Sequence, residues 1–237
     1  MSQILEVVLA NRILAHHGII DAYGHVSVRS EKDSARYLLG RSIAPETMRE
    51  EDIIEYDLDS NPLDANGRES VRERYIHGEI YKTRPEVVAV VHNHSPTVVP
   101  FSVTGVTMRA VFHMAAFIGD GLPVFEIRDA QKGTDLLVKT PYLGQALAKT
   151  LGAKSAALMR GHGSVVVGEN LPRAVGRSIY LEASARMQLQ AAMLAGPGGK
   201  IVFMDESEVA ASVPPQEYNR AWPRWRAWAL EQLKSEK

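Results

Sequence analysis

Apolar residues near the start of the chain recur at the spacing of one helical face. They are Ile4, Val7, Val8 and Leu14, and Asn11 shares their side. Gly18 stands where a helix commonly ends, because glycine adopts the left-handed backbone conformation without strain. The pattern predicts an amphipathic helix over 2–17.

The rest of the chain alternates between short apolar runs typical of strands and longer periodic segments typical of helices. We expect strands at 24–29, 35–40, 52–59, 87–91, 109–113, 123–129, 155–161 and 164–169. We expect helices at 68–83, from Ser95 and Pro96 onward, from Thr140 and Pro141 onward, and at about 172–194. Strands in the middle, with helices before, between and after them, predict an α/β sandwich formed by a single domain over 1–237.

The last part of the chain, about 196–237, has the pattern of a linker followed by an aromatic tail. "GPGGK" at 196–200 lacks the spacing of a phosphate-binding loop, and no strand precedes it. All three tryptophans lie further on, in "RAWPRWRAWAL". Such a stripe is too apolar to remain in water, so we expect it to pack against the core or against another subunit of a homo-oligomer.

Composition narrows the classes of function. The 237 residues carry a formal net charge of −1 with acids and bases mixed, which leaves no basic field for a nucleic-acid backbone. No stretch of roughly 18 residues is continuously apolar, as a membrane span requires, and no basic export signal precedes the first apolar residues. There is no cysteine, so histidine and carboxylate are the strong metal ligands available. We expect a cytoplasmic protein that binds neither nucleic acid nor membrane.

Two histidines stand at the end of a predicted strand, in "VVHNHSPT" at 90–97. Successive side chains of a strand alternate between its faces, so His92 and His94 project the same way and Asn93 projects the other way. A His-x-His pair by itself is compatible with a metal site and with an ordinary polar strand end.

An acid lies on the apolar face of the predicted helix at 68–83. The helical period places Glu73, Ile76, His77 and Ile80 on one stripe. Burial of an unpaired carboxylate is unfavourable, so Glu73 needs a cation, a metal or a proton as its partner, unless it is partly solvated near the start of the helix. His77, one turn later, is a candidate hydrogen-bond partner for Glu73.

A third histidine, His162, stands between Gly161 and Gly163 in a tight connection of two predicted strands. The glycines let the backbone approach its neighbours closely and aim the ring. Three imidazoles and one carboxylate form a ligand set suited to a first-row divalent ion. These ligand types accept Zn, Mn or Fe.

The order of these motifs resembles the class II aldolase/adducin family. The resemblance rests on "GHVSVR" after the first helix, on Glu73 four residues before His77, and on "VVHNH" and "RGHG", and it covers about residues 3–195. It implies an α/β/α sandwich with a central, mainly antiparallel sheet, and a homotetramer. It also implies that His92, His94 and His162 ligate a divalent metal. Glu73 is then the acid that moves protons and contacts the metal when no substrate is bound.

The chain departs from the sugar-phosphate members of this family where they hold phosphate. It has His25 after Gly24, Arg41 before Ser42, and Val71 with Arg72 before Glu73. A phosphate clip needs room and several small donors, whereas an arginine fork suits a planar carboxylate. With "GRSIAPE", "ERYIHGEIY", "HMAAFIGDG" and "MRGHG", these residues resemble a branch of aromatic decarboxylases. That branch includes decarboxylases of dihydroxyphthalates and of 3-hydroxy-2-methylpyridine-4,5-dicarboxylate.

The resemblance implies a metal-dependent decarboxylase of a hydroxylated aromatic or pyridine dicarboxylate. The metal would chelate a ring hydroxyl and a carboxylate, and Glu73, with its pKa kept high by apolar surroundings, would protonate the ring carbon. Candidate groups that bind the remaining carboxylate are Arg41, Arg72, His25 and Arg160, while His113 and Asp120 are candidates to close the site from above or from a neighbouring subunit.

Two alternatives remain open at this point. One is a metal-dependent aldolase or epimerase that acts on a sugar or sugar acid. The other is a non-catalytic interaction module like the adducin head domain, although such a module has no need of four convergent ligands.

Overall fold

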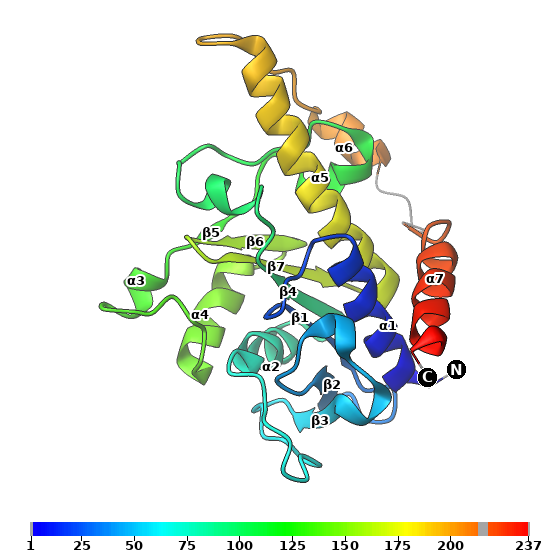
Figure 1. Ribbon diagram of the computed structural model, residues 1–237. Coiled ribbons are helices and arrows are strands. Elements are labelled where there is room, and N and C mark those ends of the chain that lie inside the picture. The colour runs from blue at the N-terminus through cyan, green and yellow to red at the C-terminus, as the bar shows by residue number, and fades with distance from the viewer. Residues whose placement is uncertain (1, 213–217, 237) are drawn as a thin grey trace.

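A mostly antiparallel sheet forms the centre of the molecule (Figure 1). A computed structural model describes residues 2–212 and 218–236, and within them seven strands pair in the order β3-β2-β1-β4-β7-β6-β5. All neighbouring strands run antiparallel except β5 and β6. The strands are β1 (His25–Arg29), β2 (Arg36–Gly40), β3 (Ile53–Asp57), β4 (Ala89–Asn93), β5 (Val124–Phe125), β6 (Ala156–Met159) and β7 (Gly163–Gly168).

Helices cover both faces of this sheet (Figure 1). One face carries α1 (Gln3–His16), α5 (Leu171–Ala195) and α7 (Trp222–Ser235), and the other carries α2 (Arg74–Thr83) and α4 (Pro141–Leu151). The shorter helices are η1 (Pro45–Thr47), η2 (Glu50–Asp52), η3 (Val99–Ser102), η4 (His113–Ile118), α3 (Ile127–Ala130) and α6 (Glu206–Ser212). The predicted α/β/α sandwich with a mainly antiparallel sheet is therefore confirmed. That residues 1–237 form one domain stays a prediction.

Strand β4 shows how the sheet separates two cores. Ala89 and Val91 belong to the apolar cluster under α1 and α5, whereas Val90 belongs to the cluster under α2 and α4. By the same alternation His92 lies on the α2 face, and Asn93 lies on the opposite face, where its Oδ1 accepts a hydrogen bond from Ser164 Oγ (2.9 Å). The strand end therefore delivers its histidines to the space between the sheet and the start of α2.

The predicted helix at 68–83 begins later than expected, at Arg74. Arg68 donates to the carbonyl oxygens of Glu51 and Ile53 (2.7 Å each), and Ser70 forms an isolated bridge with Arg41. These bonds to the first half of the sheet hold 68–73 as a loop. Glu73 consequently sits at the N-cap of α2 rather than within the helix.

Two predicted strands are wrong in whole or in part. No strand forms at 109–113, because the backbone of Ala110 bonds to Gly119 and Met204 in neighbouring loops instead of to a strand. Of 123–129, only Val124–Phe125 pairs with β6. Directly after β5, the Glu126 side chain accepts a hydrogen bond from the backbone amide of Arg128 (3.0 Å) and caps the short helix α3.

The segment after β4 forms a turn and the 3-10 helix η3 rather than a helix capped by Ser95. The buried Ser95 hydroxyl has no partner among the described residues. Instead, the buried carboxylate of Glu182 on α5 accepts from the Thr97 amide (3.1 Å) and from the Thr97 hydroxyl. The long helix α5 thus fixes the chain just after His94.

The aromatic tail packs against its own chain. Trp222, Trp225 and Trp228 of α7 contact the core that α1 helps to form, and His16 stacks on Trp228 with ring centroids 3.8 Å apart. The short helix α6 was not expected, and part of the predicted linker and tail, at 213–217, lies outside the described residues. Among the described residues, no helix is both long and apolar enough to cross a membrane.

Candidate metal centre

The end of β4 brings two histidines together on the face that α2 covers. In the sheet, His92 lies opposite His25 of β1 and opposite Val165 of β7, and it is fully buried. His94 follows directly after the strand, and its ring centroid lies 5.0 Å from that of His92. The alternation expected from the sequence therefore does juxtapose the two imidazoles.

Each of these rings is oriented by a bond at its Nδ1 atom. His92 Nδ1 donates to the carbonyl oxygen of Ser164 (3.1 Å), which can only accept, so its Nε2 carries the lone pair. His94 Nδ1 lies 3.1 Å from both carboxylate oxygens of Asp21, which imposes the same tautomer. Both Nε2 atoms are buried and lack a hydrogen-bond partner within the described part of the chain. Bonds of this kind orient metal-ligating imidazoles and increase their basicity.

The turn between β6 and β7 supplies the third imidazole. Gly161 has a φ of 64°, in the left-handed region that favours glycine. A Cβ atom at Gly163 would lie 2.0 Å from the carbonyl oxygen of Asn93, so only glycine allows this approach to β4. The His162 ring centroid consequently lies 4.9 Å from that of His92 and 5.0 Å from that of His94.

Glu73 completes the group from the start of α2, where it is 7% exposed. Its Oε1 accepts from the backbone amide of Val138 (2.8 Å). Its Oε2 lies 3.5 Å from His92 Nε2 and 3.4 Å from His162 Nε2. The candidate partner His77 is not bonded to Glu73, and its ring nitrogens face His25 and Ser27.

The electrostatics of Glu73 differ from the sequence-based expectation of a high pKa. Burial by itself would raise the pKa of Glu73, but the imidazoles of His92 and His162 outweigh burial and hold that pKa well below its usual range. Burial in turn lowers the pKa of His92, in spite of the neighbouring Glu73 carboxylate. Glu73 therefore takes the carboxylate form when its histidine neighbours, or a cation bound by them, carry positive charge.

The four side chains fit a single divalent cation. One ligand atom from each of Glu73, His92, His94 and His162 lies within 4.8 Å of the others. Buried nitrogen atoms without hydrogen-bond partners are unfavourable, and a cation bound by the His92 and His94 Nε2 atoms would satisfy them. Three imidazoles with one carboxylate form a common ligand set for Zn and related ions.

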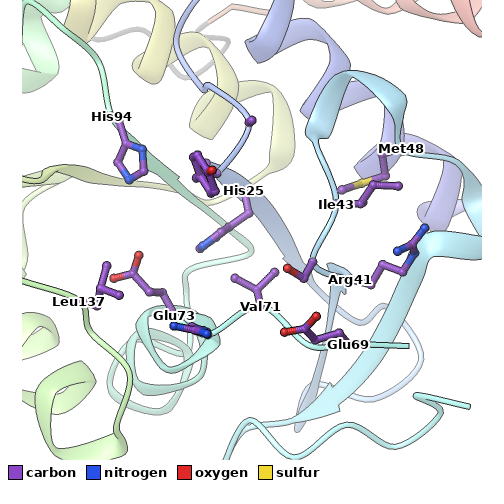
Figure 2. Close-up of a pocket in the computed structure, with 14 residues that line it drawn as sticks. His25, Arg41, Ile43, Met48, Glu69, Val71, Glu73, His94 and Leu137 are labelled. Atoms are coloured by element: carbon purple, nitrogen blue, oxygen red, sulfur yellow. The ribbon is translucent and has the colours of Figure 1, made fainter. Parts of the chain in front are cut away.

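A cavity of about 420 Å³ opens beside this cluster (Figure 2). Figure 2 shows Glu73 and His94 on one side of it and Arg41, Ile43 and Met48 on the other. Its lining residues are Ala22, Tyr23, Gly24, His25, Arg41, Ser42, Ile43, Met48, Glu69, Val71, Arg72, Glu73, His94 and Leu137. The cavity thus combines apolar walls with two arginines.

The two pocket arginines are held differently. Arg41 Nε lies 2.6 Å from the buried carboxylate of Asp52, and the arginine side chain is 35% exposed. Arg72 is exposed and has no ion-pair or hydrogen-bond partner within residues 2–212 and 218–236. Arg72 is therefore available to bind an anion, whereas Arg41 is already partly neutralised.

Other predicted substrate-binding residues lie outside the lining of this cavity. Arg160 forms an ion pair with Glu126 (Nε to Oε2, 2.6 Å). His113 is exposed at the start of η4, and Asp120 is paired with Lys154 (2.8 Å). Among the described residues of one chain, neither His113 nor Asp120 closes the site.

Several residues of the site were missed from the sequence. Asp21 carried the only local signal, since "DAYG" has the pattern of a turn in which an aspartate accepts from following amides, here those of Tyr23 and Gly24. Met48 and Leu137 come from loops whose positions depend on the whole fold. No pattern along the chain predicts them.

Comparison with known proteins places this geometry in a family. The model of the class II aldolase and adducin N-terminal domain matches residues 5–189. The decarboxylase tropJ of Talaromyces stipitatus is 35% identical over 235 residues, which cover 90% of this chain and 88% of that protein. The 3,4-dihydroxyphthalate decarboxylase of Arthrobacter keyseri is 29% identical over 214 residues, or 86% of this chain and 83% of that enzyme.

A solved structure shares the fold across almost the full length. The L-fuculose 1-phosphate aldolase from Glaciozyma antarctica PI12 superposes with a TM-score of 0.78 at 24% identity, covering 98% of this chain and 90% of that one. The sheet, the histidine cluster and the family match agree, and the chain belongs to the class II aldolase and adducin family.

Proposed function

We propose that this protein is a divalent-metal-dependent decarboxylase, a carbon–carbon lyase, that acts on a hydroxylated aromatic or pyridine dicarboxylate in aromatic catabolism. The observation that carries the proposal is a cluster of four metal ligands at one side of a cavity whose lining includes two arginines. The similarity to decarboxylases that cover most of the chain supports the same reaction class.

His92, His94 and His162 would hold the cation, with Glu73 as a further ligand when no substrate is bound. The bound ion would supply Lewis acidity toward a ring hydroxyl and an adjacent carboxylate. The tautomers of His92 and His94 are already set by Ser164 and Asp21, so these ligands require no rearrangement of their protons.

Glu73 would carry the proton between two atoms of the substrate. As a carboxylate it can accept the proton of the ring hydroxyl, and it then delivers that proton to the ring carbon that loses its carboxyl group. The C–C bond breaks, its electron pair stays with the ring, and CO₂ departs. The ring oxygen then takes a proton from water, so each turnover consumes one proton. The Oε2 atom of Glu73, which faces His92 and His162, is the oxygen placed to take up and return this proton.

Other residues of the cavity lining would select the substrate. The guanidinium of Arg72 can bind a second carboxylate through two parallel hydrogen bonds. Ile43, Val71 and Leu137 offer apolar contact to the face of a ring. Sugar phosphates lack such a face, so these walls favour an aromatic acid.

We also propose that the protein forms a homotetramer. The tryptophans of α7 no longer support this, because they pack within their own chain. The tetramer is instead supported by the exposed apolar end of α5, where Met193 is 73% exposed and Leu194 is 90% exposed. Light scattering at micromolar concentration should give four times the chain mass, and a monomer would contradict the proposal.

The direct test is CO₂ release from a panel of ring acids. Metal-free protein is reconstituted with Mn, Zn or Fe and offered hydroxylated phthalates, 3-hydroxy-2-methylpyridine-4,5-dicarboxylate and, for comparison, L-fuculose 1-phosphate. We expect CO₂ from at least one dicarboxylate and no cleavage of the sugar phosphate. Cleavage of the sugar phosphate with every ring acid untouched would identify an aldolase. No metal uptake and no turnover would favour an interaction module.

A further inference from the structure

Four buried polar side chains form a hydrogen-bonded file beneath the cavity, which we call the His25 relay. His25 Nδ1 lies 2.7 Å from His77 Nε2, His77 Nδ1 lies 2.6 Å from Ser27 Oγ, and Ser27 Oγ lies 2.8 Å from Tyr81 OH. All four residues are at most 4% exposed. The remaining nitrogen, His25 Nε2, is buried and has no partner among the described residues.

Two matching periodicities build the relay. His25 and Ser27 are two residues apart on β1 and therefore share the face toward α2. His77 and Tyr81 are four residues apart on α2 and therefore share the face toward the sheet. None of these four residues belongs to the metal-ligand cluster, which consists of Glu73, His92, His94 and His162. His25 alone among them also lines the cavity.

The unpartnered Nε2 atom of His25 lies close to the metal-ligand cluster. His25 lies opposite His92 in the sheet, with ring centroids 5.1 Å apart. Figure 2 shows the His25 side chain extending toward the space between Glu73 and His94. A substrate bound at the cluster would therefore meet His25 Nε2, and whether that atom donates or accepts a hydrogen bond depends on its tautomer.

The distances at the far end of the relay favour one of its two directions. Tyr81 has one hydroxyl proton, which can go to Ser27 Oγ at 2.8 Å or to the carbonyl oxygen of Val88 at 3.4 Å. The shorter contact is the better hydrogen bond. Ser27 then donates to His77 Nδ1, His77 donates from Nε2 to His25 Nδ1, and His25 carries its proton on Nε2. In the opposite direction Ser27 would donate to Tyr81, and the Tyr81 proton would have only the 3.4 Å contact to Val88.

We propose that the His25 relay presents the Nε2–H of His25 as a hydrogen-bond donor to an oxygen atom of the substrate, and that His77 is a positioning residue that fixes this tautomer. This inference rests on the proposed function, because it assigns the donor to a hydroxylated ring acid. His25 differs from Arg72 in this role, since an imidazole N–H makes one directional bond whereas a guanidinium forms a fork.

Nitrogen-15 NMR of the imidazoles in metal-free protein tests the tautomer without any turnover. We expect His25 and His77 both to show a protonated Nε2 and an unprotonated Nδ1. A protonated Nδ1 on His25 would overturn the inference, even if the enzyme releases CO₂. A failed substrate screen would instead refute the proposed function and leave the tautomer result standing.

A pair of hydroxyl deletions supplies a matched control. Tyr81→Phe removes the donor that sets the direction, so we expect the His25 tautomer to become mixed. Tyr37→Phe removes a hydroxyl from a neighbouring buried tyrosine that bonds to Ser60 instead, and it should leave the His25 signals unchanged. A Tyr81→Phe protein with unchanged His25 signals would contradict the relay.

Kinetics of His25 variants separate substrate binding from structural damage. His25→Phe should raise KM roughly tenfold to a hundredfold, as for the loss of a bond to a charged group, while metal content stays at the wild-type level. His25→Gln keeps an N–H donor and should recover part of the loss. Equal KM values for His25→Phe and wild type would show that His25 does not contact the substrate.

Discussion

The candidate metal ligands Glu73, His92, His94 and His162 and the two arginines that line the cavity, Arg41 and Arg72, are held in different ways. His92 is fully buried, and its Nδ1 bonds to Ser164, while Glu73 is tied to the Val138 amide. Arg72, by contrast, precedes α2 on a loop, is exposed and has no partner among the described residues. His92 and Glu73 are held in place before a substrate binds, whereas the Arg72 side chain can adapt its position.

Under the proposed function, this difference suits the candidate metal ligands and the arginines to different roles. Bond breaking requires ligands and a proton carrier that are positioned in advance, because reorganisation during the reaction raises the barrier. Recognition of a second carboxylate tolerates a mobile arginine, since one charge-assisted bond can form over a range of side-chain positions. Changes to the candidate metal ligands should therefore affect metal content and turnover, and changes to the arginines should affect substrate affinity.

The largest expected effect is the loss of a metal ligand. His92→Ala should lose bound metal and reduce CO₂ release to background, while circular dichroism still reports a folded protein. His17→Ala, on an exposed histidine beside Trp225, should keep both metal and activity. A His92→Ala protein with full metal and full activity would remove this histidine from the site.

Glu73→Gln should preserve most of the bound metal, because three imidazoles remain. The amide cannot carry a proton, so kcat should fall by roughly 10²–10⁴-fold with little change in KM. Glu69→Gln changes the other carboxylate that lines the cavity and should alter kcat far less. If the two variants had the same kcat, Glu73 would not be the proton carrier.

Arg72→Ser should raise KM and leave kcat nearly unchanged. The loss of a charge-assisted bond corresponds to about 1.5–3 kcal/mol, or roughly 10–150-fold in KM. Arg160→Ser, outside the cavity lining and paired with Glu126, should change KM little. If Arg72→Ser had no effect, Arg41 would be the next candidate for the carboxylate anchor.

The smallest expected effect is on stability in acid, and it concerns the buried His77. Burial, followed by the influence of His92, lowers the pKa of His77 to about 3. Below the unfolded pKa of about 6.5, protons bind the unfolded chain but not the folded one, so acid favours unfolding in this range. Between pH 7 and pH 5, His77 should contribute about 2 kcal/mol to the loss of unfolding free energy.

Urea unfolding of metal-free protein at the two pH values measures this contribution. The difference between pH 7 and pH 5 should be about 2 kcal/mol smaller in His77→Gln than in wild type. His25 and His92 are present in both proteins, so most of their contribution cancels in the comparison. Equal differences in the two proteins would mean that folded His77 is not kept neutral.

The cluster was predictable from sequence because short-range geometry determines it. A spacing of two on a strand aligned His92 with His94, and the glycines around His162 allowed its turn to approach β4. Other parts of the cavity lining were not predictable, because Met48 and Leu137 lie on loops whose positions depend on the whole fold. The pKa of Glu73 was also misjudged, since the histidines beside it outweigh its burial.

The errors in the predicted helices and strands have similar physical causes. The apolar run at 109–113 reads locally as a strand, but Ala110 bonds to loops that come from distant parts of the chain. The helix at 68–83 lost its first turn because Arg68 and Ser70 bond to the segments around β2 and β3. Local patterns cannot include such long-range partners.

The most direct test of the account is a titration of metal-free protein with Mn, Zn or Fe while CO₂ release from a hydroxylated aromatic dicarboxylate is followed. Activity should rise linearly and saturate at one ion per chain, the number that Glu73, His92, His94 and His162 can hold. Full CO₂ release by protein that elemental analysis shows to be free of metal would contradict it.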